Sequence, residues 1–567
     1  MLQSPVNSDI LSPVTFLERS AAVYPHKVAV RYGSSQYTYA DLRARVHRLA
    51  NALRDRGIAA GDKVIFICPN TPPLLEAHFA IPLIGAVLVA VNSELSGPEF
   101  AYIINHSEAK AVFVDSEFAG KLQQVRAELS CVQFFVNIFD RTCTSPIDGY
   151  RYELFLAGGG DAAPDPGIRD ENQLISINYT SGTTGRPKGV MYSHRATYLH
   201  VLGEIIEAGL GSETVYLWTL PMFHCNGWGF PWAVTAIGGT HVCLRGRQPA
   251  EIFHLIEKEG VTHLCAAPTV LLAMINHPGG TLVKLRRPLQ VITAGAAPTP
   301  AVIRGMEEIG ANVIHVYGLT ELHGPHSVCA WQSQWVELDP ENVSKMKARQ
   351  GVPYIVSRHM AVLDRETQLP VASDGRAIGE VVMRGNNVML GYYKDPEATA
   401  EVFRDGWFHS GDLAVVHPDG YIQIVDRLND GIVRAGATIP SMEIEEIIYR
   451  HPEVLEVAVV STPDQWQGEV PKAFVMMKDG ATLTEDELID FCRRQGTDAH
   501  APAIVEFGQL PKTATGKTMK AKLRHQEWQR VLDGDMAWHG PQDNPPVDRA
   551  LDGAAATFDN EKGARAI

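Results

Sequence analysis

Residues 179–189 read Tyr-Thr-Ser-Gly-Thr-Thr-Gly-Arg-Pro-Lys-Gly, and this stretch decides how the rest of the chain is interpreted. An alternating polar and apolar run at 174–178 precedes it and predicts a strand. Glycines let backbone N–H groups turn toward one point, the Ser and Thr hydroxyls add donors, and Arg186 and Lys188 add positive charge. Such a loop after a strand suits a polyphosphate. The alternative is a solvated turn, but the two cations favour phosphate binding.

The spacing of this loop excludes a Walker A motif. That motif needs Gly directly before its lysine and Ser or Thr directly after it, whereas Lys188 lies between Pro187 and Gly189. Residues 516–518, Gly-Lys-Thr, match the end of a Walker A motif, but Pro511 stands where its first glycine would be. Neither stretch therefore predicts a P-loop nucleoside triphosphatase.

Composition places the chain among globular proteins of more than one domain. Its 567 residues are too many for one simple core, and 45% are hydrophobic and 20% charged. A formal charge of -15 argues against nucleic acid as a partner. The eight cysteines show no CxxC spacing, which predicts neither a zinc site nor a disulfide framework and favours the reducing cytoplasm. We expect no secretory signal and no membrane span.

Strands and helices are predicted to alternate through the first part of the chain. Residues 27–32 and 36–39 alternate as a strand pair, and residues 42–53 place leucine and valine at helical spacing. A buried strand at 64–68, an apolar helix at 74–88 and a strand from residue 90 follow. This order predicts an α/β fold with helices packed on parallel sheets.

Residues 220–232, Leu-Pro-Met-Phe-His-Cys-Asn-Gly-Trp-Gly-Phe-Pro-Trp, are unusually rich in aromatic side chains. Such density is typical of a core. A histidine between aromatic residues and close to two glycines is an odd way to fill a core, however. We therefore interpret the segment as part of a binding pocket with apolar walls.

Three further stretches have compositions that suit a nucleotide site, and a fourth is interpreted through the resemblance described below. Small residues at 291–298, Val-Ile-Thr-Ala-Gly-Ala-Ala-Pro, allow a flat ring to approach the backbone. A single carboxylate in 313–321, Val-Ile-His-Val-Tyr-Gly-Leu-Thr-Glu, together with phosphate oxygens, is typical of Mg²⁺ binding. Asp412, at the end of 406–412, can accept the two hydroxyl hydrogen bonds of a ribose. The fourth stretch, 510–518, reads Leu-Pro-Lys-Thr-Ala-Thr-Gly-Lys-Thr.

In this order, over about residues 13–530, the motifs resemble those of the adenylate-forming superfamily. The branch they resemble is that of acyl-CoA synthetases for short- and medium-chain or benzoate-like acids. The resemblance implies a large N-terminal domain of layered sheets and helices, residues 1–428, and a small mobile α+β lid, residues 429–532, with a hinge at Asn429. Residues 533–567 are polar and predict a disordered tail.

The resemblance also implies which residues contact ATP. They lie in the phosphate loop, in two strand-to-loop junctions and near the hinge. The set comprises Thr180, Ser181, Gly182, Thr183, Thr184, Gly185, Lys188, Gly295, Ala296, Ala297, Pro298, Tyr317, Gly318, Thr320, Asp412 and Arg427.

The catalytic residues implied by the resemblance are Lys517, His224 and Glu321. Lys517 would stabilise the charge on the carboxylate and α-phosphate, and Glu321 would bind Mg²⁺. His224 would lie between the carboxylate site and the acceptor channel, with Trp228 and Trp232 lining the acyl pocket. Apolar walls of this kind discriminate about 1–3 kcal/mol per methylene.

The implied reaction is attack of a carboxylate on the α-phosphate of ATP, which gives an acyl-adenylate and pyrophosphate, followed by transfer to CoA. One alternative is a different acceptor, as in the relatives from biosynthetic gene clusters of secondary metabolism that adenylate nitrite and diazotise an aryl amine. Another is a nucleotide-binding protein without catalysis, which the intact motif residues argue against. The sequence leaves open whether the chain forms a homodimer.

Two departures from the family pattern concern the acceptor side. Residues 435–438 read Ala-Gly-Ala-Thr where relatives commonly have paired glycines, and His500 replaces a common lysine. Arg434 and Lys472 are candidates to compensate as cations near CoA. We therefore expect CoA to bind more weakly than in typical relatives, and adenylation to proceed without it.

Overall fold

The computed structural model describes residues 9–140, 146–180, 186–277, 285–357, 359–434, 437–464, 467–496, 498–513 and 517–532. The chain forms two compact units. Unit 1 comprises Met1–Thr180, Lys188–Met360 and Met383–Phe408, and unit 2 comprises Ser181–Pro187, Ala361–Val382 and His409–Ile567. The predicted tail, 533–567, lies outside the described residues.

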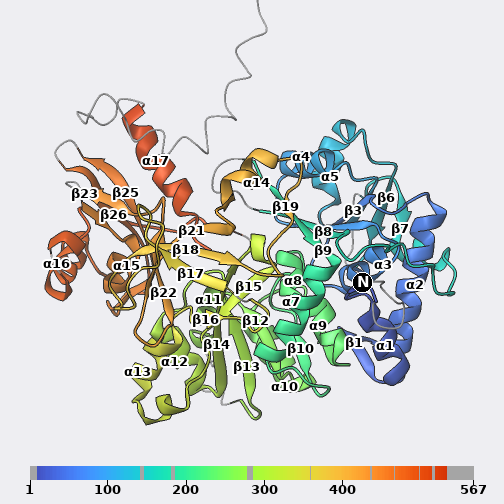
Figure 1. The fold of residues 1–567 in the computed structure, drawn as a ribbon, viewed down its shortest axis with the longest axis horizontal. Coiled ribbons are helices and arrows are strands. Elements are labelled where there is room, and N and C mark those ends of the chain that lie inside the picture. The colour runs from blue at the N-terminus through green and yellow to red at the C-terminus, as the bar shows by residue number, and fades with distance from the viewer. Residues whose placement is uncertain are drawn as a thin grey trace, which may run out of the picture. The chain divides into compact units, whose positions relative to one another are not determined.

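Unit 1 contains an eight-stranded sheet of order β19-β9-β8-β4-β3-β5-β6-β7 (Figure 1). Its strands β8, β4, β3, β5, β6 and β7 are parallel, while at one edge β9 pairs antiparallel with β8 and β19 pairs antiparallel with β9. The strands are β3 Lys63–Ile67, β4 Val87–Val91, β5 Ala111–Asp115, β6 Phe134–Ile138, β7 Tyr150–Arg151, β8 Leu174–Tyr179, β9 Gly189–Ser193 and β19 Gly391–Tyr392.

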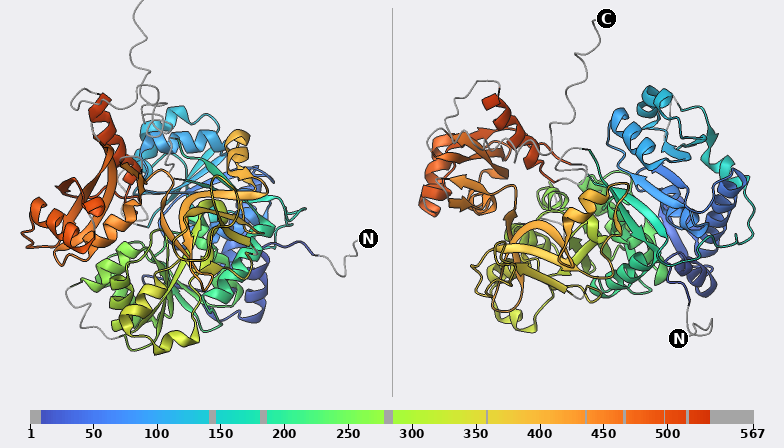
Figure 2. Two further views of the ribbon diagram at one scale, coloured as in Figure 1. Left: turned by 60° about the vertical axis from the view of Figure 1, so that its left-hand side comes forward. Right: turned by 45° about the horizontal axis from the view of Figure 1, so that its top comes forward.

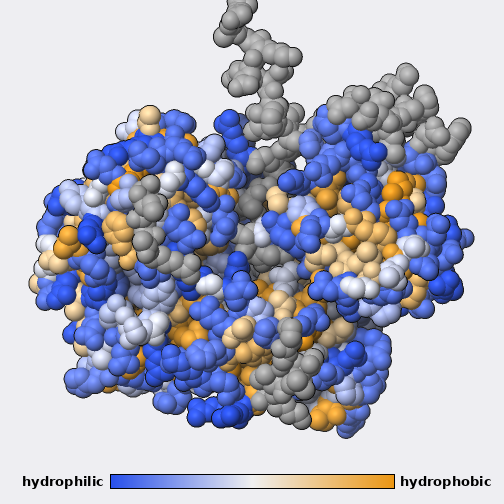
Figure 3. Space-filling view, turned by 180° about the vertical axis from the view of Figure 1, so that it is seen from behind, coloured by the Kyte–Doolittle hydropathy of each residue, from blue (hydrophilic) through white to orange (hydrophobic). Residues whose placement is uncertain are grey.

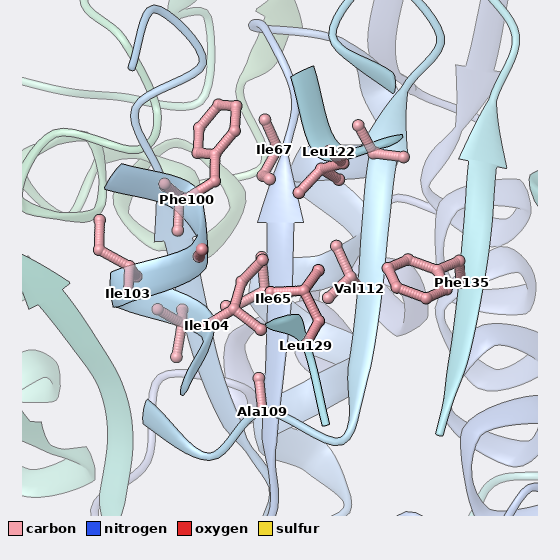
Figure 4. Packing of buried hydrophobic residues seen from close by; sticks show 14 of the residues in the cluster. Ile65, Ile67, Phe100, Ile103, Ile104, Ala109, Val112, Leu122, Leu129 and Phe135 are labelled. Carbon is pink, nitrogen blue, oxygen red and sulfur yellow. The ribbon is translucent and has the colours of Figure 1, made fainter. Parts of the chain in front are cut away.

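Helices lie on both sides of this sheet, as Figure 2 shows. Continuous apolar runs in β3 to β5 are typical of strands that are buried on both faces. In Figure 4, Ile65 of β3 and Val112 of β5 pack with Phe100 and Leu122 from the helices above them. The helices of this region are α2 Tyr39–Asp55, α3 Pro72–Leu83, α4 Gly97–Ser107, α5 Ala119–Val125, η1 Arg126–Glu128 and α6 Tyr152–Ala157.

The helix expected at 74–88 is shorter than predicted. It ends at Leu83, and β4 begins at Val87 rather than at residue 90. Gly85 forms the turn with φ +75°, and a Cβ there would lie 2.4 Å from the carbonyl oxygen of Gly167. Hydrophobicity alone could not locate this boundary because both elements are buried and apolar.

The second sheet of unit 1 has nine strands in the order β16-β15-β14-β13-β12-β10-β11-β1-β2. Strands β14, β13, β12, β10, β11 and β1 are parallel, and the outer strands are antiparallel. The strands are β1 Val28–Tyr32, β2 Ser35–Thr38, β10 Val215–Leu217, β11 Thr240–Val242, β12 His263–Ala266, β13 Leu289–Thr293, β14 Ala311–Leu319, β15 Gly324–Val328 and β16 Val352–Pro353.

The remaining helices of unit 1 accompany this second sheet. They are α1 Thr15–Val23, α7 His194–Glu207, α8 Cys225–Trp228, α9 Phe230–Ala236, α10 Pro249–Glu259, α11 Pro268–Ile275, α12 Pro300–Glu308, η3 Thr320–Leu322, η4 Ser333–Glu337, α13 Pro340–Lys347 and α14 Pro396–Val402. Buried side chains from α10, α11 and α12 form one core with β12, β13 and β14. The α/β fold expected from the sequence is therefore confirmed.

Unit 2 contains one small sheet completely and shares a second with unit 1, to which β20 belongs. One has the order β24-β23-β26-β25 with β27 on β26, and the other has the order β17-β18-β21-β20 with β22 on β21; the division between the units falls within β17, β18 and β21. The strands are β17 His359–Leu363, β18 Gly379–Arg384, β20 Phe403–Arg404, β21 Trp407–Val416, β22 Ile422–Arg427, β23 Ile432–Arg434, β24 Ala437–Ile439, β25 Val454–Asp464, β26 Gly468–Met477 and β27 Ile504–Phe507.

The helices of unit 2 are α15 Ser441–Tyr449, α16 Glu485–Gln495, η5 Asp498–His500 and α17 Lys520–Leu532. Apolar side chains of α15 and α16 pack on β25 and β26. The predicted hinge residue, Asn429, lies between β22 and β23 and is exposed.

Hydrophilic residues cover most of the face seen in Figure 3, with smaller hydrophobic areas between them. No helix among the described residues is long and apolar enough to cross a membrane. The described cysteines are all free, and most are buried.

Candidate active site

The phosphate loop is closed at its base by strands β8 and β9. These strands pair in antiparallel register, with Tyr179 opposite Gly189. The N–H of Thr180 donates to the carbonyl of Lys188 at 3.0 Å, and the N–H of Lys188 donates to the Thr180 hydroxyl at 3.3 Å. The loop therefore starts and ends at a fixed point of the eight-stranded sheet. Its predicted residues Ser181, Gly182, Thr183, Thr184 and Gly185 lie outside the described residues.

Two predicted ATP-contacting segments follow neighbouring parallel strands of the second sheet. Gly295, Ala296, Ala297 and Pro298 come after β13, and the segment from Tyr317 onward ends β14. Ligands of α/β proteins bind at the carboxyl ends of such strands. The first three of these residues are exposed or half-buried, so backbone is accessible there.

Gly318 is required by a close approach of two strands. A Cβ at this position would lie 1.7 Å from the carbonyl oxygen of Gly324 in β15. The register of β14 and β15 shifts between Tyr317 and Gly318, so the strand bends just before the Thr-Glu pair. Only glycine permits this packing, and the register shift lies directly before the end of β14, where the Thr-Glu turn begins.

Thr320 and Glu321 form a short 3-10 turn, and Tyr192 of the neighbouring strand β9 contacts this turn. The Tyr192 hydroxyl of β9 donates to the Thr320 carbonyl at 2.5 Å, and the Tyr192 ring stacks on His323 with 3.6 Å between ring centroids. The Glu321 carboxylate accepts a hydrogen bond of 2.8 Å from the Tyr392 hydroxyl. The strand that leaves the phosphate loop thus also holds the Thr-Glu turn.

The donor set around Glu321 fits Mg²⁺ better than a metal held by protein alone. The described residues contain no group of three or more His, Cys, Asp or Glu side chains arranged to bind a metal. Mg²⁺ commonly uses one or two carboxylates and completes its shell with phosphate oxygens and water. A single carboxylate beside a phosphate loop meets this requirement.

The aromatic segment forms a left-handed turn directly after His224. Residues 225–229 all have positive φ, from 44° at Asn226 to 79° at Gly229. This conformation costs about 1–2 kcal/mol for each residue other than glycine. Cys225, Asn226 and Trp228 adopt it, and strain of this kind concentrates at functional sites.

Asn226 is the residue that holds this turn against the eight-stranded sheet. Its side-chain oxygen accepts hydrogen bonds from Ser176 at 2.5 Å and from Asn178 at 2.6 Å, both in β8. Its backbone N–H donates to the Asn178 side chain at 2.9 Å, and its side-chain nitrogen lies 3.2 Å from His78 Nε2. Sequence reasoning missed these residues. The sequence feature that could have indicated them is the pair of polar residues at 176 and 178, which lie on one face of a strand that is otherwise apolar.

The two tryptophans of the segment lie in the interior. Trp228 is 3% exposed and its ring lies against Gly324, where a Cβ would be 2.9 Å from the indole Cδ1. Trp232 is 1% exposed, and its indole N–H donates to the His78 carbonyl at 3.0 Å. His224 is half-buried at the start of the turn. Their roles at an acyl pocket remain predictions.

In unit 2, three predicted site residues come together. Asp412 of β21 and Arg427 of β22 are direct cross-strand partners, with 3.3 Å between Arg427 Nε and Asp412 Oδ1. Lys517 lies within electrostatic reach of both. Burial, reinforced by Arg427, lowers the pKa of Lys517 to about 8, while Asp412 and Asp430 oppose the shift.

Hydrogen bonds at its base fix the loop that carries Lys517. The N–H of Lys517 donates to the Thr513 hydroxyl at 3.1 Å, and the N–H of Thr513 donates to the Lys517 carbonyl at 2.8 Å. Lys512 contacts the Thr518 hydroxyl at 2.8 Å and forms an ion pair with Glu456. Residues 514–516 lie outside the described residues.

On the acceptor side, the structure corrects the expectation that Lys472 is a cation near CoA. Lys472 is 2% exposed and its Nζ contacts Glu527 at 2.7 Å and Glu506 at 2.8 Å, so it is not a cation available to a polyanion. Its position in the centre of β26 explains the burial. His500 contacts Glu443 at 3.1 Å, and Arg434 donates to Gln467 at 2.6 Å.

Comparison with protein families identifies the class of the chain. Residues 17–393 match the AMP-binding enzyme family, and residues 443–517 match the AMP-binding enzyme C-terminal domain. The chain therefore belongs to the AMP-binding enzyme family, as the sequence motifs predicted.

Similar proteins refine the class. A 4-hydroxybutyrate–CoA ligase of Metallosphaera sedula is 46% identical over 523 residues, which cover 91% of this chain and 94% of that protein. A peroxisomal acetate/butyrate–CoA ligase of Arabidopsis thaliana is 44% identical, covering 92% and 95%. ATP-bound MatB from Rhodopseudomonas palustris has a TM-score of 0.80 at 26% identity, covering 91% and 99%. Within its family the chain is an AMP-forming acid–CoA ligase.

Proposed function

We propose that the chain activates a short- or medium-chain carboxylic acid with Mg²⁺ and ATP and transfers the acyl group to CoA. The observation that carries the proposal is the pair of half-sites. Unit 1 presents Lys188, Thr320 and Glu321 around the phosphate loop, and unit 2 presents Lys517 beside Asp412 and Arg427.

The first half-reaction forms one bond and breaks one. A carboxylate oxygen attacks the α-phosphorus, and the bond from that phosphorus to the bridging oxygen breaks, so that pyrophosphate leaves. Lys517 offsets the charge that builds up on the carboxylate and α-phosphate, and Lys188 binds the phosphates that depart. When bound, Mg²⁺ supplies charge neutralisation at the phosphates, with Glu321 as the residue that would hold it and Thr320 as a donor to a phosphate oxygen.

The second half-reaction transfers the acyl group to sulfur. The CoA thiolate attacks the acyl carbon, the bond from that carbon to the phosphate oxygen breaks, and AMP leaves. His224 is half-buried at the start of the strained turn, where it can orient the incoming thiol. The short acids in the names of the relatives at 44–46% identity support a short or medium chain.

The experiment measures pyrophosphate release and thioester formation with a panel of acids from two to ten carbons and with benzoate. We expect acid-dependent pyrophosphate release and a CoA thioester of a short or medium acid. Parallel reactions replace acid and CoA by nitrite and an aminoaryl acid. Nitrite-dependent AMP release without any thioester would overturn the proposal in favour of a diazotising enzyme.

A further inference from the structure

A short segment, residues 389–393, joins the phosphate-loop strand to the Thr-Glu turn; we call it the strap. The N–H of Met389 donates to the Glu321 carbonyl at 2.8 Å. The N–H of Leu390 donates to Met191 at 2.9 Å, and the N–H of Tyr393 donates to Gly189 at 2.7 Å, both in β9. Within the strap, β19 pairs with β9 in antiparallel register. The backbone of the strap therefore contacts both segments that the proposed function assigns to the phosphates and the metal.

One side chain of the strap contacts the functional groups themselves. The Tyr392 hydroxyl donates to Glu321 Oε1 at 2.8 Å. The Nζ of Lys188 lies 5.0 Å from the centroid of the Tyr392 ring, within the range of a cation–π interaction. Tyr392 is 7% exposed, and its two partners, Lys188 and Glu321, are half-buried, so both contacts are partly shielded from water.

The two contacts use different parts of the same ring. The hydroxyl donates to one oxygen of the Glu321 carboxylate and so helps to fix the direction in which that carboxylate points. The ring face attracts the ammonium and holds the flexible lysine side chain in one direction. Partners behind a metal ligand orient it, and their loss commonly weakens metal binding about 10- to 100-fold.

We infer that Tyr392 is a positioning residue that sets Glu321 for Mg²⁺ and Lys188 for the phosphates at the same time. The inference rests on the proposed function, because it assumes that these two residues meet Mg²⁺ and ATP. It adds a residue to that site which acts without touching the reacting atoms. Its hydroxyl acts on the metal, and its ring acts on the nucleotide.

The chain offers a matched control in the next residue. Tyr393 also donates its hydroxyl to a carboxylate, that of Glu108 at 3.3 Å, and its ring lies near Lys394 and Lys63. Tyr393→Phe therefore removes a comparable tyrosine–carboxylate hydrogen bond away from Glu321 and Lys188.

The experiment measures ATP binding by calorimetry over a range of Mg²⁺ concentrations, together with acid-dependent pyrophosphate exchange and the melting temperature. In Tyr392→Phe we expect the Mg²⁺ concentration needed for half-maximal ATP binding to rise about tenfold, while ATP affinity without Mg²⁺ stays unchanged. Tyr392→Leu, which also removes the ring, should in addition weaken ATP binding without Mg²⁺ about three- to fivefold. Tyr393→Phe should change neither value.

An unchanged Mg²⁺ requirement in Tyr392→Phe would overturn the inference, whether or not the melting temperature falls, because a structural role alone moves stability and not the metal requirement. Binding and turnover separate the two proposals. A wild-type protein that binds ATP with Mg²⁺ but shows no acid-dependent exchange would contradict the proposed function, and the binding data would still decide the role of Tyr392.

Discussion

Different kinds of interaction stabilise the half-site of unit 1 and the half-site of unit 2. In unit 1, uncharged donors hold the site: the hydroxyls of Tyr192 and Tyr392 donate to the Thr-Glu turn, and the side-chain amide of Asn178 donates to Asn226. In unit 2, the site is surrounded by charges, with Lys517 near Asp412 and Arg427. Hydrogen bonds from uncharged donors depend less on pH and salt than interactions between two charged groups do. The unit 1 half-site is thus fixed, and the unit 2 half-site is balanced between opposing charges.

Buried charges also support the segment next to the Lys517 loop. Lys520 contacts Glu445 at 2.6 Å and the Ser441 hydroxyl at 2.8 Å, and Arg524 forms an ion pair with Asp430. Burial alone would lower the pKa of Lys520, but Glu445 and the nearby aspartates outweigh it and raise that pKa. Lys520, at the start of α17, therefore keeps its positive charge, whereas the pKa of Lys517, three residues earlier, is lowered.

The largest effect is expected from Lys517→Ala. It should slow adenylation about 10³-fold or more, since a charge in a desolvated site contributes strongly to transition-state stabilisation. Transfer from a preformed acyl-adenylate to CoA should be nearly unaffected. The measurement compares pyrophosphate exchange with single-turnover thioester formation, and the control is Lys478→Ala, an exposed lysine of the same unit. Equal loss in both half-reactions would remove the functional distinction between the half-sites.

Glu321→Gln is expected to have the next largest effect. The amide cannot supply the negative charge that Mg²⁺ requires, so exchange at 1 mM Mg²⁺ should fall about 100-fold and recover partly at high Mg²⁺. The free energy of unfolding should change by less than about 1 kcal/mol. The readouts are Mg²⁺ titrations of exchange and urea unfolding. A loss that no Mg²⁺ concentration relieves, or a large loss of stability, would contradict the ligand role.

The pH dependence of the adenylation rate should also distinguish the two half-sites, although the effect is smaller. Adenylation needs protonated Lys517, so its rate should fall about tenfold per pH unit above the lysine pKa of about 8. The folded-state pKa lies below the ordinary value of 10.5, so the unfolded chain binds more protons between these pH values. The unfavourable burial of the charge is thus fully present below pH 8, and the contribution of Lys517 to stability rises between pH 8 and 10.5.

The matched variant for this profile is Lys517→Arg. Arginine stays protonated, so the decline above pH 8 should disappear even though the rate is lower throughout. Persistence of the same decline in Lys517→Arg would assign it to another group.

The smallest effect is expected from Asp430→Asn. Removing the charge from the partly buried pair with Arg524 should destabilise unit 2 by about 1–3 kcal/mol and leave unit 1 unaffected. Asp490→Asn, which removes an exposed pair with Arg493, should change stability by less than about 0.5 kcal/mol. Hydrogen exchange of the two units measures both changes. Equal effects of the two substitutions would show that burial of the pair contributes nothing.

The fold and the motif positions were accessible from the sequence because they depend on local patterns. The strand before the phosphate loop, the glycine-rich composition and the order of the motifs are all local properties. Asn226 and Tyr392 were not accessible as site residues, because their importance comes from partners 48 and 71 positions away. Lys472 was misjudged as a free cation because its burial is decided by the strands beside it. Sequence patterns thus locate elements better than they locate the contacts between elements.

The left-handed turn after His224 bears on how acid preference can be altered by segment exchange between homologous ligases. The turn is strained on its own and is retained by Ser176, Asn178 and His78, which lie outside the aromatic segment. A chimera that imports residues 220–232 without these three residues would import the turn without the hydrogen-bond partners that hold it. When pocket segments are exchanged in laboratory evolution, the segment and its three polar neighbours should therefore be transferred together.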